Sequence, residues 1–163
     1  KGHYTDWVAN PEAYPQSGMG GANVGPEFTA VEYQALCDLL AMEHERAQAD
    51  PSLTPSRLLE TLEIVVCESG RWKKWLQPGE ETIPFTRLAP DRKEWLVQTG
   101  CRYIWTDPRV VAERQKLYAN LAPALSDSHQ FVVDRIAERI GHYIHRFNLS
   151  GSTAYFTGQL EVR

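Results

Sequence analysis

The segment Gly20-Gly21-Ala22-Asn23-Val24-Gly25-Pro26-Glu27 decides how the rest of the chain is interpreted. Its pattern indicates a short strand that breaks into a helix, because glycine and proline interrupt the run directly after Val24. His3 lies 20 residues before Asn23 and suits the end of a preceding strand. Two strand ends at this spacing, each followed by a loop, favour adjacent strands of a parallel α/β barrel, in which the carboxyl ends of the strands carry the chemistry.

The length of the chain limits how much of such a barrel it holds. A complete TIM (β/α)8 barrel takes about 250 residues, whereas this chain has 163 and begins at Lys1. We therefore expect an α/β fold that is the C-terminal portion of a TIM barrel, followed by a mainly α-helical region. Residues 1–47 would hold the end of strand 7, a loop, strand 8 and helix 8, and residues 48–163 a helical C-terminal extension.

That expectation has a physical consequence for the isolated chain. Two barrel strands without the missing N-terminal barrel portion would leave exposed strand edges. We therefore expect residues 1–163 alone to be insoluble or molten.

Several later stretches carry helical periodicity or helix-start signals. A capping-box pattern at Thr29 predicts one start. Asp107 before a proline predicts another, and Pro55 a third. Residues 101–105 instead look extended. The expected helices cover residues 29–47, 56–68, 108–121 and 128–147.

Composition excludes several classes of protein. Hydrophobic content of 42% and charged content of 23% are typical of a soluble globular protein. A net charge of −4 argues against a nucleic-acid partner. No apolar run approaches the roughly 20 residues of a membrane span. Cys37, Cys67 and Cys101 are odd in number and widely spaced, which favours free thiols and a cytoplasmic location.

Three motifs carry a resemblance to a known family. They are Asn23-Val24-Gly25-Pro26-Glu27-Phe28-Thr29, His3-Tyr4-Thr5-Asp6, and Arg102-Tyr103-Ile104-Trp105-Thr106-Asp107. Together they resemble the tagatose-bisphosphate aldolase accessory (non-catalytic) subunit family, which is often labelled tagatose-6-phosphate kinase. This chain looks like the C-terminal part of that family. The family is in turn similar to the class II, metal-dependent ketose-bisphosphate aldolases.

The resemblance implies a metal and sugar site at the mouth of a barrel. His3 matches the aldolase histidine that binds the catalytic divalent metal, and Asn23 matches an asparagine that holds the substrate. Zinc is the expected metal, with manganese, cobalt and nickel as alternatives. Without the resemblance, His3 reads as a surface or core histidine, and Asn23 as a turn residue among glycines.

Asp6, Gly20 and Gly21 complete the candidate site. Asp6 is the catalytic candidate, because a carboxylate there could orient the imidazole, bind sugar hydroxyls or move a proton. The alternative is an aspartate that caps a loop. Gly20 and Gly21 could let the backbone approach a substrate closely, although ordinary loop geometry explains them equally well. Glu43-His44-Glu45 superficially suggests metal binding, but it lacks the second histidine of a zincin and reads as a solvated helix end.

The chain departs from the aldolase pattern after His3. Aldolases have Gly-Gly-Ser-Gly there to hold a phosphate, whereas this chain has Tyr4-Thr5-Asp6-Trp7. Because Asp6 would repel a phosphate, a ketohexose or a ketohexose 6-phosphate is easier to fit than a bisphosphate.

Two functional hypotheses follow from the resemblance. The first is a divalent-metal-dependent epimerase acting at C4 of tagatose, fructose or their 6-phosphates, with the metal as a Lewis acid. The alternative is a non-catalytic subunit that supports a class II tagatose-1,6-bisphosphate aldolase. Its partners would then be an aldolase catalytic subunit or further copies of the chain. The kinase label has no support, because no phosphate-binding Gly-x-x-x-x-Gly-Lys-Ser/Thr loop is present.

Overall fold

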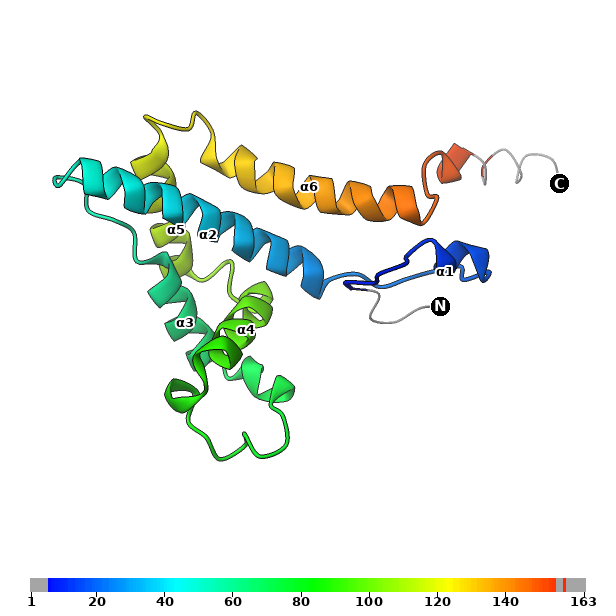
Figure 1. Ribbon diagram of the computed structural model, residues 1–163, viewed down its shortest axis with the longest axis horizontal. Coiled ribbons are helices and arrows are strands. Elements are labelled where there is room, and N and C mark those ends of the chain that lie inside the picture. The colour runs from blue at the N-terminus through cyan, green and yellow to red at the C-terminus, as the bar shows by residue number, and fades with distance from the viewer. Residues whose placement is uncertain (1–5, 155–156, 158–163) are drawn as a thin grey trace.

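The computed structural model describes residues 6–154 and residue 157, and all its regular elements in that range are helices (Figure 1). The α-helices are α1 (Ala13–Gln16), α2 (Pro26–Ala49), α3 (Leu58–Ser69), α4 (Pro90–Gly100), α5 (Pro108–Leu121) and α6 (Ser128–Arg146). Three short 3-10 helices lie between them: η1 (Arg71–Trp75), η2 (Phe85–Arg87) and η3 (Cys101–Tyr103).

The prediction of a barrel portion is wrong for the described residues. They contain no strand and no sheet, apart from an isolated bridge at Ala22. The physical reason lies in the backbone after Val24, where the N–H groups of Gly25 and Glu27 donate to the Asp6 carboxylate instead of to a neighbouring strand. The chain then enters α2 directly.

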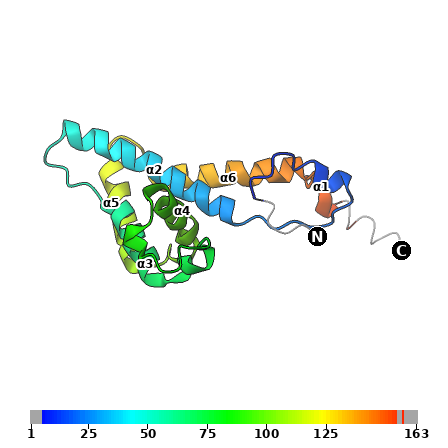
Figure 2. The same cartoon turned by 60° about the horizontal axis from the view of Figure 1, so that its bottom comes forward.

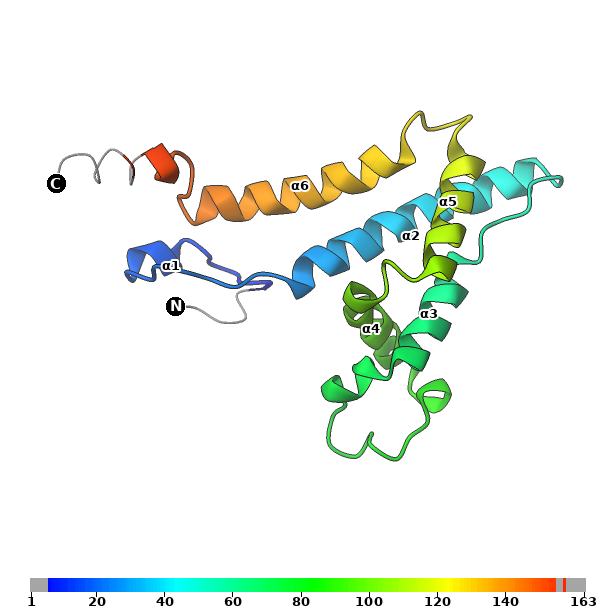
Figure 3. The same cartoon turned by 180° about the vertical axis from the view of Figure 1, so that it is seen from behind.

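The long helix α2 organises the molecule. Figures 1 and 3 show α6 lying antiparallel along α2 and α3 and α4 on the other side of α2, while α5 crosses α2. Figure 2 shows the same arrangement from a tilted view, with α1 placed away from the α3–α5 group. The core therefore forms where α2 meets α3, α4 and α5.

Leucine and valine side chains fill this core. Each Å² of apolar surface that they bury stabilises the fold by about 25 cal/mol, so this burial is the main favourable term for the fold. The fully buried members include Leu36, Leu39, Leu58, Leu62, Val66, Leu96, Val110, Leu117 and Leu121. Helices α3 and α4 also approach closely, since a side chain on Gly100 would lie 2.7 Å from Val66 Cγ1.

Helix boundaries agree with the sequence in part. The helices expected over 29–47, 56–68, 108–121 and 128–147 are all present, as α2, α3, α5 and α6. Asp107 accepts a hydrogen bond from the Arg109 N–H as the N-cap of α5. The capping box at Thr29 is wrong, because α2 already begins at Pro26.

Two other local expectations are also wrong. Helix α3 begins at Leu58 rather than at Pro55, since Glu43 of α2 accepts from the Ser56 N–H at 2.9 Å and Glu113 of α5 from the Arg57 N–H at 2.6 Å. Residues 101–105 form the 3-10 helix η3 and the turn that follows it instead of an extended segment. There the burial of Cys101 and Ile104 in the core overrides the β-propensity of the sequence.

The three cysteines are free thiols, as expected. Cys101 is fully buried, and its burial raises the pKa of the thiol well above the ordinary value. Within the described part of the chain, no helix is long and apolar enough to cross a membrane.

Candidate functional site

A polar cleft opens at the N-terminal end of α2. Asp6 and Arg102 line it together with residues 22–26, which include Asn23, and its volume is about 480 Å³. The structure thus brings two of the predicted site residues to one place. It adds Arg102, whose guanidinium group comes from η3, some 80 residues further along the chain.

Asp6 caps the N-terminus of α2. Its Oδ1 atom accepts hydrogen bonds from the Gly25 N–H at 3.0 Å and from the Glu27 N–H at 2.7 Å. The N-cap residue itself is Gly25, which has no side chain to serve this purpose. A carboxylate at this position satisfies free helix N–H groups and interacts favourably with the helix dipole. This contact matches the loop-capping alternative for Asp6, and the catalytic role stays a prediction.

The other predicted site residues are more dispersed. Asn23 is exposed at the cleft. Gly20 and Gly21 are exposed and do not line it, and a side chain on Gly20 would meet no atom within 4 Å. His3 lies outside the described residues, so its proposed role as a metal ligand is not tested.

The residues that are described do not fit a metal centre. No group of three or more His, Cys, Asp or Glu side chains among them could hold a metal ion. Asp6 is the only predicted site carboxylate, and its Oδ1 is already used by two backbone donors. We therefore derive no chemical step through a metal.

Glu27, directly beside the cleft, is a buried carboxylate that sequence reasoning did not single out as a site residue. Only 3% of it is exposed. It accepts hydrogen bonds from the Trp7 N–H and the Tyr143 hydroxyl, and it pairs with Arg139 at 3.2 Å. Burial, followed by the hydrogen bond to Glu27, raises the pKa of Tyr143. Glu27 thus ties the segment before α1, the start of α2 and the end of α6 together.

Glu43 is a second buried carboxylate, and the expectation of a solvated helix end is wrong for it. Only 2% of Glu43 is exposed, whereas His44 and Glu45 are exposed. Glu43 accepts from the Ser56 backbone and hydroxyl groups, the latter at 2.7 Å, and from the Asn120 amide. It therefore joins α2 to the loop before α3 and to α5, which is a structural role.

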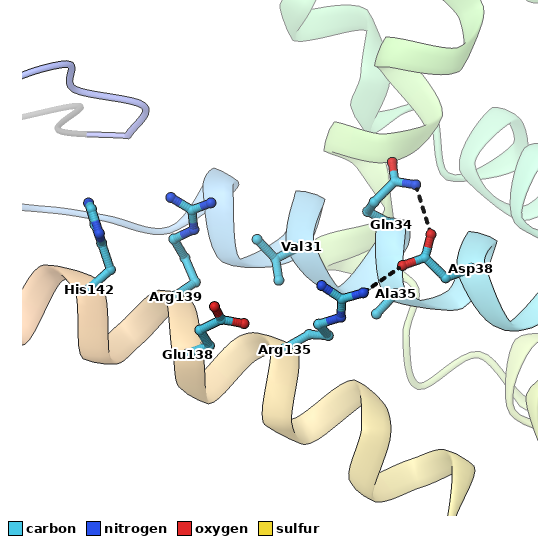
Figure 4. A pocket seen from close by; sticks show the side chains of 8 residues that line it. All are labelled: Val31, Gln34, Ala35, Asp38, Arg135, Glu138, Arg139 and His142. Atoms are coloured by element: carbon cyan, nitrogen blue, oxygen red, sulfur yellow. Dashed lines mark hydrogen bonds and ion pairs between the residues drawn. The ribbon is translucent and has the colours of Figure 1, made fainter. Parts of the chain in front are cut away.

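A further cleft of about 320 Å³ lies between α2 and α6 (Figure 4). Arg135 of α6 reaches Asp38 of α2 at 3.2 Å, and Gln34 donates to the same carboxylate at 3.4 Å. Arg139, which also lines this cleft, is paired with Glu27. Because these guanidinium groups already have carboxylate partners, the cleft is better explained as an ion-paired seam between the helices than as an anion site.

Within the described residues, the fold and its clefts define an α-helical domain with a small polar cleft and no assembled metal-binding cluster. Two curated relatives show what the chain is similar to. The D-tagatose-1,6-bisphosphate aldolase subunit GatZ of Klebsiella pneumoniae subsp. pneumoniae is 31% identical over 104 residues, which cover 62% of this chain and 22% of the relative. The GatZ subunit of Salmonella paratyphi B is 32% identical over 101 residues, which cover 60% of this chain and 21% of the relative.

These two proteins are distant relatives, and they confirm the resemblance stated from the sequence motifs. The chain spans about a fifth of the length of the curated relatives it matches. No protein-family profile matches the chain. No solved structure matches it either.

Proposed function

We propose that this chain acts in ketohexose metabolism as part of a non-catalytic subunit that supports a class II tagatose-1,6-bisphosphate aldolase. The observation that carries the proposal is the similarity to two proteins named as subunits of that aldolase, over about three fifths of the chain. The buried polar contacts of Glu27 and Glu43 support it, because they stabilise the helical body and leave neither carboxylate available for catalysis.

Co-expression with a catalytic tagatose-bisphosphate aldolase subunit from the same organism tests the proposal. We expect residues 1–163 to co-purify with the catalytic subunit and to slow its thermal inactivation several-fold, because a partner that binds only the folded state stabilises it. The chain alone should show no aldolase activity. Failure to bind, together with unchanged inactivation of the catalytic subunit, would contradict the proposal.

The C4 epimerase remains a separate candidate, carried by the residues His3, Asp6 and Asn23. Its discriminating assay is conversion between tagatose and fructose, or their 6-phosphates, by the chain with added zinc or manganese. Metal-dependent turnover that a His3→Ala variant abolishes would favour the epimerase. Turnover that is absent in both proteins would leave the accessory role as the better explanation.

A binding role for the cleft can be tested in the same samples. A guanidinium group beside a side-chain amide can bind a phosphate or sugar hydroxyls. If Asn23 and Arg102 bind a ketohexose phosphate, tagatose 6-phosphate should stabilise the wild-type chain thermally but not an Asn23→Ala/Arg102→Ala variant.

A further inference from the structure

Three cationic side chains from η1 and η3 gather around one tyrosine. The Arg71 Cζ atom lies 4.9 Å from the centre of the Tyr103 ring. The Lys74 Nζ atom lies 4.5 Å from the same centre, and the Arg102 Cζ atom lies 5.2 Å from it. The three cations are exposed, and Tyr103 is half-buried. We call these four residues the cationic cluster.

The cationic cluster has no carboxylate partner within the described part of the chain. The ion pairs found there involve other arginine and lysine side chains. The acidic residues nearest to the cluster in the sequence, Glu68 and Asp107, both pair with Arg109, at 2.8 and 3.1 Å. Because the chain has a net charge of −4, composition alone does not explain three unpaired cations in one place.

Such a cluster repels itself. Each charge lies about 5 Å from the same ring, so the three lie within about 10 Å of one another, which is one Debye length at 0.1 M salt. Contact with the electron-rich ring offsets part of this repulsion. The hydrogen bond from Lys74, followed by the nearby positive charges, lowers the pKa of Tyr103, and no described carboxylate opposes them. A bound anion would offset the remaining repulsion.

The cations also keep unused hydrogen-bond donors. A guanidinium group that stacks on an aromatic ring keeps its N–H groups in its own plane, where they can reach an acceptor. The side chains of Arg71 and Arg102 donate no hydrogen bond to a described residue, and Lys74 spends one of its three donors on the Tyr103 hydroxyl. A phosphate group matches this set, because it carries nearly two negative charges and three acceptor oxygens. A carboxylate would neutralise only one of the three cations.

Arg102 joins the cationic cluster to the polar cleft at the start of α2. It lines that cleft with Asn23, and its Nη2 atom would lie 3.8 Å from a side-chain carbon placed on Gly25. Asp6 lines the same cleft without pairing with Arg102, and its Oδ1 atom accepts from the Gly25 and Glu27 N–H groups. A phosphate bound at the cluster would therefore place the group that carries it beside the cleft.

We propose that the cationic cluster is a phosphate-binding site, in which Arg71, Lys74 and Arg102 hold the anion. The phosphate is either free or the end group of a small phosphomonoester, since the same donors suit both. The proposal does not rest on the accessory role, because no aldolase takes part in the binding.

Isothermal titration calorimetry of residues 1–163 tests the site with inorganic phosphate, tagatose 6-phosphate and unphosphorylated tagatose. We expect the two phosphate-bearing probes to bind and tagatose not to bind. Equal affinities would assign the site to the phosphate group alone. Binding of tagatose 6-phosphate at least about tenfold tighter would assign it to a phosphomonoester whose sugar reaches the cleft. Both affinities should fall as the salt concentration rises, because the cations are exposed.

Two matched double variants locate the site. Arg71→Gln/Lys74→Gln should weaken both phosphate probes at least about 30-fold, because two charge-assisted contacts are lost. Lys73→Gln/Arg87→Gln is the control, since it also removes one lysine and one arginine charge from exposed positions. The Lys73 Nζ atom lies 6.0 Å from the Trp72 ring and is not part of the cluster. The control should bind as the wild type does, and circular dichroism checks that both variants are folded.

The tyrosine ring has its own test. Tyr103→Phe keeps the surface on which the guanidinium groups stack and releases the Lys74 donor, so binding should change by less than about threefold. Tyr103→Leu removes the aromatic surface and should weaken binding by about tenfold, because the cations are no longer held in place.

Three results would overturn the proposal. One is the absence of binding by both phosphate probes at millimolar concentration. Another is an equal loss in the two double variants, which would show that only the overall charge matters. The third is an Arg71→Gln/Lys74→Gln chain that no longer co-purifies with the aldolase, while the wild type binds the aldolase but no phosphate. That pattern would assign the cluster to an acidic protein surface and would leave the accessory function intact, so the two failures are distinguishable.

Discussion

Glu27 joins three parts of the chain through one side chain. It is 3% exposed, accepts from the Trp7 N–H and the Tyr143 hydroxyl, and pairs with Arg139. Removing the carboxylate would leave these donors without their acceptor in a buried place. We expect Glu27→Ala to lower the free energy of unfolding by about 2–4 kcal/mol, measured by urea denaturation.

The matched control for this change is Glu45→Ala. Glu45 lies on the same helix but is exposed, so its replacement should alter stability by less than about 0.5 kcal/mol. Equal effects of the two changes would show that the contacts of Glu27 contribute nothing specific. A Tyr143→Phe variant combined with Glu27→Ala should cost less than the two separate effects added together, because both changes remove the same hydrogen bond.

At the scale of single residues, the sequence could predict which site residues lie close together but not the role of each. Asp6 and Asn23 were expected in one site and line one cleft, since the intervening loop returns the chain to the start of α2. Glu27 carried only a local signal, an acidic residue in the first turn of a helix. Its partner Tyr143 lies 116 residues further along, and no local pattern connects two residues at that separation.

Helices α3 and α4 approach each other closely at Gly100. A methyl group there would lie 2.7 Å from Val66 Cγ1 and 3.2 Å from Val66 Cγ2, and Val66 is fully buried. We expect Gly100→Ala to destabilise the protein by about 1–3 kcal/mol through overpacking, measured by thermal or urea unfolding. Val66→Ala alone should also destabilise it, because it leaves a cavity.

The double variant shows whether the contact is the cause. Gly100→Ala with Val66→Ala should be more stable than the sum of the single effects predicts, because the added methyl group fills the vacated space. Gly141→Ala supplies a control within α6, where the added group meets no atom within 4 Å. That change should be neutral or stabilising by up to about 1 kcal/mol, since alanine favours a helix. Strict additivity at Gly100 and Val66 would contradict the explanation.

Helices with explicit start signals were the elements that could be predicted. Asp107 followed by proline fixed the start of α5, and the long amphipathic repeat of α6 fixed its extent. The apparent strand at Ala22-Asn23-Val24 is reduced to an isolated bridge at Ala22. Directly after it, Asp6 accepts from the N–H groups of Gly25 and Glu27, so the chain turns into α2 instead of continuing as a strand. The apparent strand at 101–105 failed for a different reason, namely that Cys101 and Ile104 are buried in a tight turn of the core.

For the whole molecule, the core predicts how the chain unfolds. The buried leucines and valines of α2, α3, α4 and α5 form one continuous cluster, to which Val132 of α6 also belongs. We therefore expect residues 1–163 to unfold in one cooperative transition, with far-ultraviolet circular dichroism and tryptophan fluorescence giving the same midpoint. Trp72 and Trp75 report on the core, because Trp72 is buried and Trp75 packs against the cluster.

This expectation replaces the molten or insoluble chain that a barrel portion would give. That earlier inference depended on unpaired strand edges, and the described residues contain no strands. Broad transitions whose midpoints differ between the two measurements would contradict a single core. The sequence could not reveal this arrangement, because the contacts of α2 with α6, α4 and α5 join segments far apart in the chain.

The rate at which Cys101 reacts with a thiol reagent reports how often the core opens. The Cys101 side chain is fully buried in the core, and the raised pKa keeps the thiol protonated, so a thiol reagent cannot attack it while the core is closed. Cys37 and Cys67 are only partly buried and should react first. The lag before the third modification therefore times the spontaneous opening of the α2–α5 core, in native buffer and without an engineered probe.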